Sequence, residues 1–206
     1  MFKNRLDAAE KLGLALARYR KQHPLVLGIP RGAVPMACHI ARQLEGEVDV
    51  VLVRKLTSPY DAELALGAAD ETGWMYVGDY AARYGGTPEY LEQERTRQLE
   101  VMHQRRRQYT PIRARIDPAG RIVIVVDDGL ATGSTMIAAL HALRARKPAR
   151  LICAVPVAPP DTLEKVGPYC DEMVCLEAPR NFQAVSQFYQ NFPQVSDDEV
   201  IAALAG

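Results

Sequence analysis

Two adjacent carboxylates, followed by a loop of small hydroxyl residues, are the part of this sequence best suited to chemistry. Asp127 and Asp128 follow a β-branched run, and every side chain from Gly129 to Thr135 except Leu130 is small. Small side chains let backbone N–H groups approach an anion, and Ser and Thr hydroxyls add further donors. The stretch therefore predicts a phosphate site beside two acids.

A buried strand and a helix are expected to position this site. The run from Ile122 to Val126 is short and continuous, as in a strand that is covered on both faces of a parallel sheet. The spacing of Met136, Ile137, Leu140 and Leu143 predicts a helix directly after the loop. The N-terminal amides and dipole of that helix would point at the same anion.

Other phosphate or carboxylate motifs fit the stretch less well. A P-loop needs a lysine after its second glycine, and none follows Gly133. The dinucleotide fingerprint Gly-x-Gly-x-x-Gly is missing too. Phosphatases with an aspartate nucleophile place two aspartates one residue apart, whereas Asp127 and Asp128 are adjacent. An ordinary strand–helix turn with two solvated aspartates is the plain alternative.

A second anion site is predicted after the first apolar run of the chain. Leu25 to Ile29 reads as a buried strand that ends in Pro30-Arg31-Gly32, and a helix is expected from about Val34 to Leu44. A strand, a glycine turn with one arginine and a helix N-terminus bring amides and a guanidinium to one point. A plain loop with a surface arginine is the alternative.

Two cations follow the next apolar run. Val48 to Val53 predicts a third strand, and Arg54 and Lys55 come directly after it. The carboxyl ends of parallel strands form the rim where open sheets bind ligands, so both cations are candidates for anion binding. A solvated strand end is the alternative.

The alternation of strands and helices predicts the fold class. Further buried strands are expected at Leu151–Val157 and Met173–Leu176, and a turn at Thr72-Gly73 between apolar segments suggests a β-hairpin. A long charged helix is expected from Pro88 to about Gln108. The pattern is that of an α/β protein with a three-layer, doubly wound parallel sheet.

Composition narrows the function classes. The chain has 206 residues, and Lys plus Arg and Asp plus Glu both number 25, so it has no excess basic charge for a nucleic-acid backbone. No apolar run approaches membrane-spanning length, and the charged N-terminus does not read as a signal peptide. We expect a cytoplasmic protein that binds neither nucleic acid nor membranes.

The central stretch resembles the type I phosphoribosyltransferases, whose signature is an apolar strand, an acidic pair and a loop rich in Thr, Gly and Ala. Val125-Val126-Asp127-Asp128 and Ala131-Thr132-Gly133-Ser134-Thr135 match that signature position by position. Gly129 departs from it, since the family more often has an aliphatic residue or Ser there. A glycine would loosen the loop without removing a phosphate donor.

The resemblance implies transfer of 5-phosphoribosyl from phosphoribosyl pyrophosphate (PRPP) to a nitrogenous base, with Mg²⁺ held chiefly by ligand oxygens. The acid pair would hold the ribose hydroxyls, and the loop would hold the 5′-phosphate. Arg31, Gly32, Arg54 and Lys55 would stabilise the departing pyrophosphate, and we expect a non-proline cis peptide at Pro30-Arg31 or Arg31-Gly32. The acid pair and the two cations Arg54 and Lys55 are the candidate catalytic residues.

The resemblance also implies how the chain is organised. One domain is expected, with a core at about 22–176, a flap at about 55–80 whose mobile loop lies near Leu56 to Ala62, and a small C-terminal hood at about 177–206. The aromatic residues of this tail could stack a base or simply pack against the sheet. Dimers are common in the family, so a homodimer is expected, while the acceptor base stays open.

Two other functions are alternatives to this transfer. A regulator that senses PRPP would keep the binding loop but have no turnover, and the retained cations argue for catalysis instead. A phosphate-binding hydrolase is disfavoured because the sequence has neither a Gly-x-Ser-x-Gly elbow nor a metal cluster.

Overall fold

The computed structural model describes residues 1–206, which form two sheets and six α-helices. Strands β1 (Leu25–Gly28), β2 (Glu47–Val50), β6 (Ile122–Val126), β7 (Arg150–Val157) and β8 (Glu172–Glu177) make a five-stranded parallel sheet in the order β2-β1-β6-β7-β8. The helices are α1 (Arg5–Ala15), α2 (Ala33–Leu44), α3 (Pro88–Tyr109), α4 (Ser134–Arg144), α5 (Pro160–Val166) and α6 (Asp197–Ala205).

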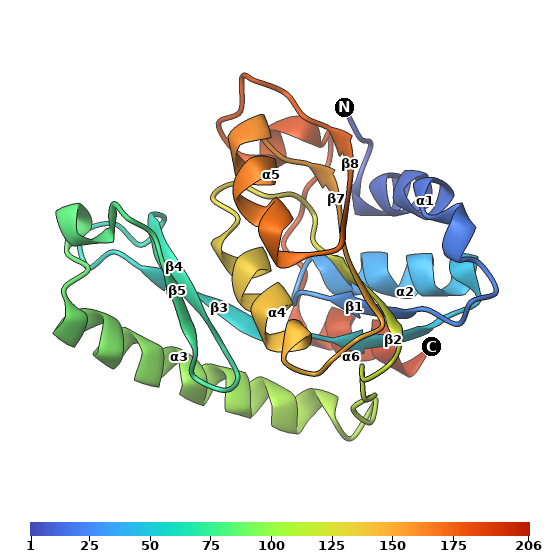
Figure 1. The fold of residues 1–206 in the computed structure, drawn as a ribbon, viewed down its shortest axis with the longest axis horizontal. Coiled ribbons are helices and arrows are strands. Elements are labelled where there is room, and N and C mark those ends of the chain that lie inside the picture. The colour runs from blue at the N-terminus through green and yellow to red at the C-terminus, as the bar shows by residue number, and fades with distance from the viewer.

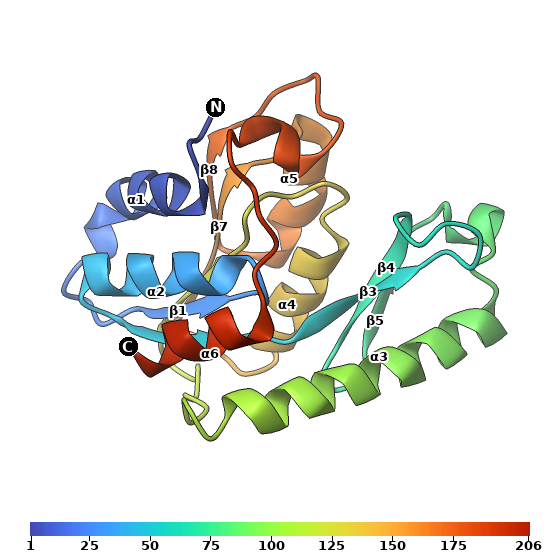
Figure 2. The same ribbon diagram turned by 180° about the vertical axis from the view of Figure 1, so that it is seen from behind.

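Helices cover both faces of the parallel sheet, which confirms the predicted three-layer α/β fold. α4 and α5 lie on one face, and α1, α2 and α6 lie on the other (Figures 1 and 2). Alternate strand residues enter two separate cores: Val26 and Ile124 pack with α1 and α2, whereas Val123 and Val125 pack with α4. Burial on both faces explains why these strands read as continuous apolar runs.

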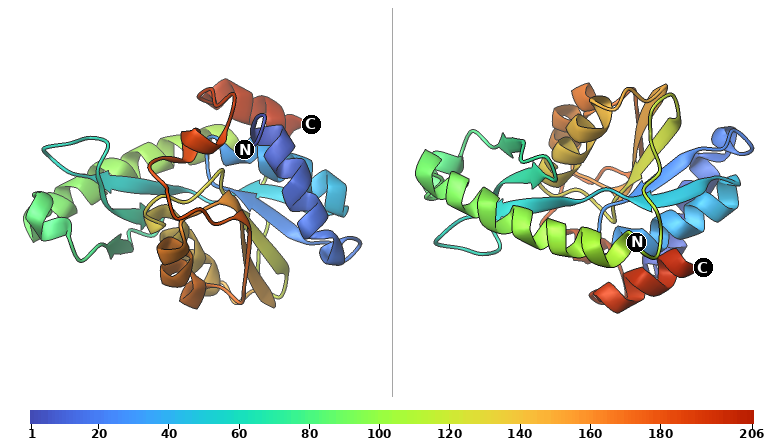
Figure 3. Two further views of the ribbon diagram at one scale, coloured as in Figure 1. Left: turned by 90° about the horizontal axis from the view of Figure 1, so that it is seen from above. Right: turned by 90° about the horizontal axis from the view of Figure 1, so that it is seen from below.

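A second sheet lies beside the first. Its strands β3 (Val53–Thr57), β4 (Ala65–Asp70) and β5 (Met75–Val77) are antiparallel, and the turn between β4 and β5 contains the predicted hairpin residues Thr72-Gly73. This sheet and the long helix α3 extend together to one side of the five-stranded sheet (Figure 3). At the hairpin turn, the ring of Trp74 stacks on His141 of α4, with ring centroids 3.6 Å apart.

The expectation of one strand from Val48 to Val53 was wrong. β2 ends at Val50, and after Val51 and Leu52 the chain enters β3 of the other sheet. Val51 and Leu52 are buried at this junction, so the apolar run continues although the strand does not. Arg54 and Lys55 therefore lie on β3 and not at the end of a core strand.

The first residues of the chain pair with the C-terminal tail. Phe2 pairs with Tyr189 in a short parallel bridge, in which the Phe2 amide donates to Phe188 and the Gln190 amide donates to Phe2. After Phe192 the tail leads into α6, which is capped at Ser196 and packs against α2. None of the helices combines the length and hydrophobicity needed to cross a membrane.

Candidate functional site

A cavity of about 660 Å³ opens where β1 and β6 end and β3 begins. Its wall includes nearly all of the predicted site residues: Arg31, Gly32, Arg54, Lys55, Asp127, Asp128, Ala131, Thr132, Gly133 and Thr135. The β3–β4 loop adds Ala62 and Glu63, and the C-terminal tail adds Val185 and Phe192. The fold thus brings three separate stretches of predicted anion-binding residues to one cavity.

The loop after the acid pair presents free amides. The backbone N–H groups of Ala131, Thr132 and Gly133 donate no hydrogen bond within the chain. The carbonyl oxygens are held from α5, since the Thr162 hydroxyl donates to Ala131 O at 2.7 Å and Lys165 Nζ donates to Thr132 O at 3.1 Å. A loop whose acceptors are occupied and whose donors are free is prepared for an anion.

Gly133 and Ser134 start α4 with different roles. Gly133 has φ +79°, and a Cβ there would lie 2.7 Å from Val166 Cγ2, so glycine is required by both conformation and packing. Ser134 is only 1% exposed, and its hydroxyl lies 3.1 Å from Thr132 Oγ1. Thr132 lines the cavity and Ser134 is buried behind it, so direct contact of the Ser134 hydroxyl with a phosphate stays a prediction.

The departure from the family pattern at Gly129 has a steric reason. A Cβ at Gly129 would lie 2.6 Å from Val185 Cγ1 and 3.1 Å from Val157 Cγ1. The tail residue Val185 occupies the space that an aliphatic side chain would take. The glycine therefore allows the tail to approach the loop closely, which is a different consequence from the loosening expected from sequence.

The Pro30-Arg31-Gly32 turn and the cations of β3 line the same cavity. The Pro30-Arg31 peptide is cis, as expected for this turn, and the amides of Arg31 and Gly32 are free of partners within the chain. Arg54 Nε donates to Gln98 Oε1 of α3 at 2.8 Å. Burial, together with the charges of Arg105 and Arg31, lowers the pKa of Arg54. An anion in the cavity would relieve this crowding of positive charge.

The acid pair carries an unfavourable concentration of negative charge. Burial and the neighbouring Asp128 raise the pKa of Asp127 well above its usual range, although Lys55 opposes the shift. Burial also raises the pKa of Asp128, and Arg5 opposes that shift because its Nε lies 2.9 Å from Asp128 Oδ2. Hydroxyl donors or a cation placed beside these carboxylates would favour the ionised forms.

Arg5 was not among the residues that the sequence predicted for this site. Its side chain is 12% exposed and reaches Asp128 from 123 positions away. Such a contact depends on the way α1 crosses the sheet, and a single arginine at a helix start carries no sequence signal for it. The N-cap of the helix is Asn4, whose side chain accepts from the Asp7 amide.

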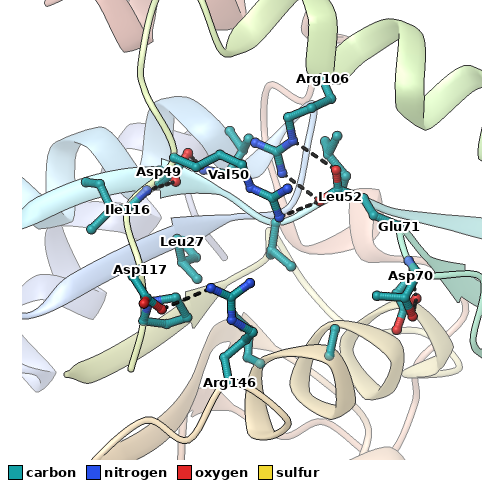
Figure 4. A pocket seen from close by; sticks show the side chains of 16 residues that line it. Leu27, Asp49, Val50, Leu52, Asp70, Glu71, Arg106, Ile116, Asp117 and Arg146 are labelled. Carbon is teal, nitrogen blue, oxygen red and sulfur yellow. Dashed lines mark hydrogen bonds and ion pairs between the residues drawn. The ribbon is translucent and has the colours of Figure 1, made fainter. Parts of the chain in front are cut away.

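A second cavity, of about 330 Å³, lies toward the far end of α4 and was not predicted. Arg106 of α3 donates to both carboxylate oxygens of Glu71, and Arg146 pairs with Asp117 at 3.1 Å (Figure 4). Asp49 accepts from the amides of Val50 and Ile116. Most charged groups here are thus satisfied by one another or by the backbone; Arg106 Nη1 and Asp70 Oδ2 have no partner in the chain.

Comparison with known proteins places the chain in a family. Residues 3–192 match the phosphoribosyl transferase domain. Proteins of two Mycobacterium tuberculosis strains, provisionally named phosphoribosyl transferases, are 41% identical over 99% of this chain and 46% of their own length. The chain thus spans about half the length of these curated relatives. A Thermus thermophilus crystal structure, of TT1426, is 43% identical over 99% of this chain and 97% of that one, with a TM-score of 0.81.

Proposed function

The chain belongs to the phosphoribosyl transferase domain family, and we propose that it transfers 5-phosphoribosyl from PRPP to a nitrogenous base and releases pyrophosphate. One observation carries the proposal: a single cavity is lined by two stretches with unpaired amides, by two cations and by two carboxylates. PRPP carries two anionic groups, a phosphate and a pyrophosphate, on either side of its ribose. The acceptor base is not specified by the residues that line the cavity.

Each stretch has a distinct task in this reaction. The amides of Ala131, Thr132 and Gly133 hold the 5′-phosphate, and Asp127 and Asp128 accept hydrogen bonds from the ribose hydroxyls. The sugar is thereby aligned for displacement at C1, where alignment and charge placement supply most of the catalysis. The carboxylates also offer negative charge to the cation-like centre that develops at C1.

The Pro30-Arg31-Gly32 turn and the two cations of β3 stabilise the leaving group. The Arg31 and Gly32 amides and the cations of Arg54 and Lys55, which line the same cavity, would hold the departing pyrophosphate. Charge that develops on the pyrophosphate oxygens is met by groups already in place, so little reorganisation is needed during the reaction. The β3–β4 loop, which borders the cavity through Ala62 and Glu63, could close over the substrate and exclude water.

The donor set of the cavity suits Mg²⁺ that takes most of its ligands from the substrate. Asp127 and Asp128 supply the hard carboxylate oxygens that Mg²⁺ prefers, and the chain has no cluster of three or more ligating side chains. When bound, Mg²⁺ would neutralise charge on pyrophosphate. A catalytic cavity that depends on its substrate for metal ligands would bind the two together.

Incubation with PRPP, Mg²⁺ and a panel of purine, pyrimidine and pyridine bases tests the proposal, with pyrophosphate release as the readout. Release with one class of base is the expected result and would name the acceptor. If calorimetry shows that PRPP binds but no base causes release of pyrophosphate, a PRPP-sensing regulator would be favoured instead. No PRPP binding at all would contradict both functions.

A further inference from the structure

The first residue of α6 brings a carboxylate into a group of arginines beside the candidate site. Asp197 Oδ2 lies 3.8 Å from Arg31 Nη1, and Asp197 Oδ1 lies 3.5 Å from Arg105 Nε of α3. Arg31 lines the cavity, whereas Asp197 and Arg105 do not. Any influence of Asp197 on a ligand in the cavity is therefore indirect.

Asp197 is anchored by a hydroxyl and not by the arginines. The Tyr109 hydroxyl, at the end of α3, donates to Asp197 Oδ1 at 2.7 Å, and the start of α6 lies beside this end of α3 (Figure 2). Both separations from the arginines exceed the roughly 2.7–3.2 Å that is typical of an N–H···O hydrogen bond. Asp197 thus places a negative charge beside Arg31 and Arg105 while leaving their N–H groups free for another acceptor.

Positive charge exceeds negative charge around this carboxylate. Burial is the first cause that lowers the pKa of Arg54, and the nearby charges of Arg105 and Arg31 add to it. The carboxylates of Glu94 and Asp197 oppose that shift. Glu94 is already engaged by neighbouring side chains of its own helix. The three arginines therefore share the charge of Asp197, and the group as a whole keeps a positive excess.

We propose that Asp197 is a positioning residue, which holds Arg31 beside the cavity by charge alone and limits how tightly the cavity binds pyrophosphate. The inference rests on the proposed function for the identity of the anion. Arg31 can donate to the departing pyrophosphate because its N–H groups are free, while Asp197 offsets part of the charge attraction. Binding substrate and product equally tightly adds nothing to the rate of the chemical step, and slow release of product can limit turnover. A negative charge at this position favours release.

Asp197→Asn tests the inference, because it removes the charge and keeps an oxygen that can accept from Tyr109. In calorimetric titration with inorganic pyrophosphate at low salt, the dissociation constant should be about three to ten times lower than that of the wild type, as expected for loss of one partly exposed charge a few ångströms away. The gain should shrink in about 0.5 M NaCl, since salt screens exposed charges. Damage to the fold would not produce a gain in affinity. Asp197→Ser, which is also neutral, should show the same gain.

Asp198→Asn is the matched control. It removes the same charge from the next position of the same helix turn, where Asp198 is exposed and forms no ion pair. Its affinity for pyrophosphate should equal that of the wild type. An unchanged or weaker affinity in folded Asp197→Asn, or an equal gain in both variants, would overturn the inference.

Failure of the proposed function gives a different pattern. The wild-type protein would then release no pyrophosphate from PRPP with any base, while the difference in pyrophosphate affinity between Asp197→Asn and the wild type would remain. A wild-type protein that binds no pyrophosphate at all would overturn both the proposed function and the role of Asp197.

Discussion

The two cavities contain the same kinds of charged residue and use them differently. In the cavity toward the far end of α4, Arg106 and Arg146 are paired with Glu71 and Asp117. In the cavity at the strand ends, the loop amides have no partner, and Arg31 reaches a carboxylate, that of Asp197, only at 3.8 Å. An anion entering the cavity toward the far end of α4 would have to displace an existing partner, whereas in the cavity at the strand ends it would find free donors. The number of cations is a poorer guide to anion binding than their unsatisfied hydrogen-bonding capacity.

The largest effect is expected when both acid charges are removed from the cavity at the strand ends, because turnover should then be lost. Asp127→Asn combined with Asp128→Asn should lower kcat/KM by about a thousandfold or more, since the groups that align the ribose lose their charge. Steady-state pyrophosphate release gives the measurement, and circular dichroism shows whether the fold is kept. Wild-type activity in the folded double variant would remove the ribose assignment.

A smaller effect is expected in the loop, where two hydroxyls can be compared. Thr132→Ala should weaken binding of ribose 5-phosphate by about 1–3 kcal/mol, the usual contribution of a hydrogen bond to a charged group. Ser134→Ala should weaken it less, because the Ser134 hydroxyl is buried against Thr132. Calorimetric titration of both variants ranks them, and a larger loss in Ser134→Ala would reverse the assignment.

The acid pair should also make the stability of the protein without ligand depend on pH. Because the pKa of Asp127 is raised in the folded chain, the folded state keeps a proton that the unfolded chain releases. Stability of the wild type is therefore lost as pH rises from about 4 toward that raised pKa. At about pH 8, Asp127→Asn should have a higher Tm than the wild type. The difference in Tm between the two proteins should vanish near pH 4. A difference in Tm that does not change with pH would contradict the raised pKa of Asp127.

The smallest effect is expected at the second cavity. Arg146 and Asp117 are both more than half exposed, at 54% and 65%, so Arg146→Met should change the free energy of unfolding by less than about 1 kcal/mol. Affinity for PRPP should not change. Denaturant unfolding and calorimetry together test this, and a loss of PRPP affinity in Arg146→Met would show that the two cavities are coupled.

The sequence predicted those parts of the fold and the candidate site that are determined by a short stretch of chain. The strand Ile122–Val126 was predicted to the residue, because burial on both faces selects a continuous β-branched run. The acid pair and the loop up to Gly133 follow it directly, so their common location required no knowledge of the fold. The turn at Pro30-Arg31-Gly32 could be added because parallel strands end at one edge.

Features that depend on packing between distant segments could not be predicted. The break after Val50 is hidden because Val51 and Leu52 are as buried as the strands on either side. Arg5 is separated from Asp128 by most of the chain, and Val185 meets Gly129 only because the tail returns over the sheet. Periodicity and motif spacing describe one segment at a time, so they do not reveal which segments meet.

The contact between Trp74 and His141 gives the protein an optical reporter of its own. Trp74 is the sole tryptophan of the sequence, and its indole stacks on the imidazole of His141 in α4, the helix that starts directly after Gly133. Any motion of the second sheet relative to α4 would separate the two rings and change the environment of the indole. Its emission would therefore report movement of the second sheet against α4 in unlabelled protein.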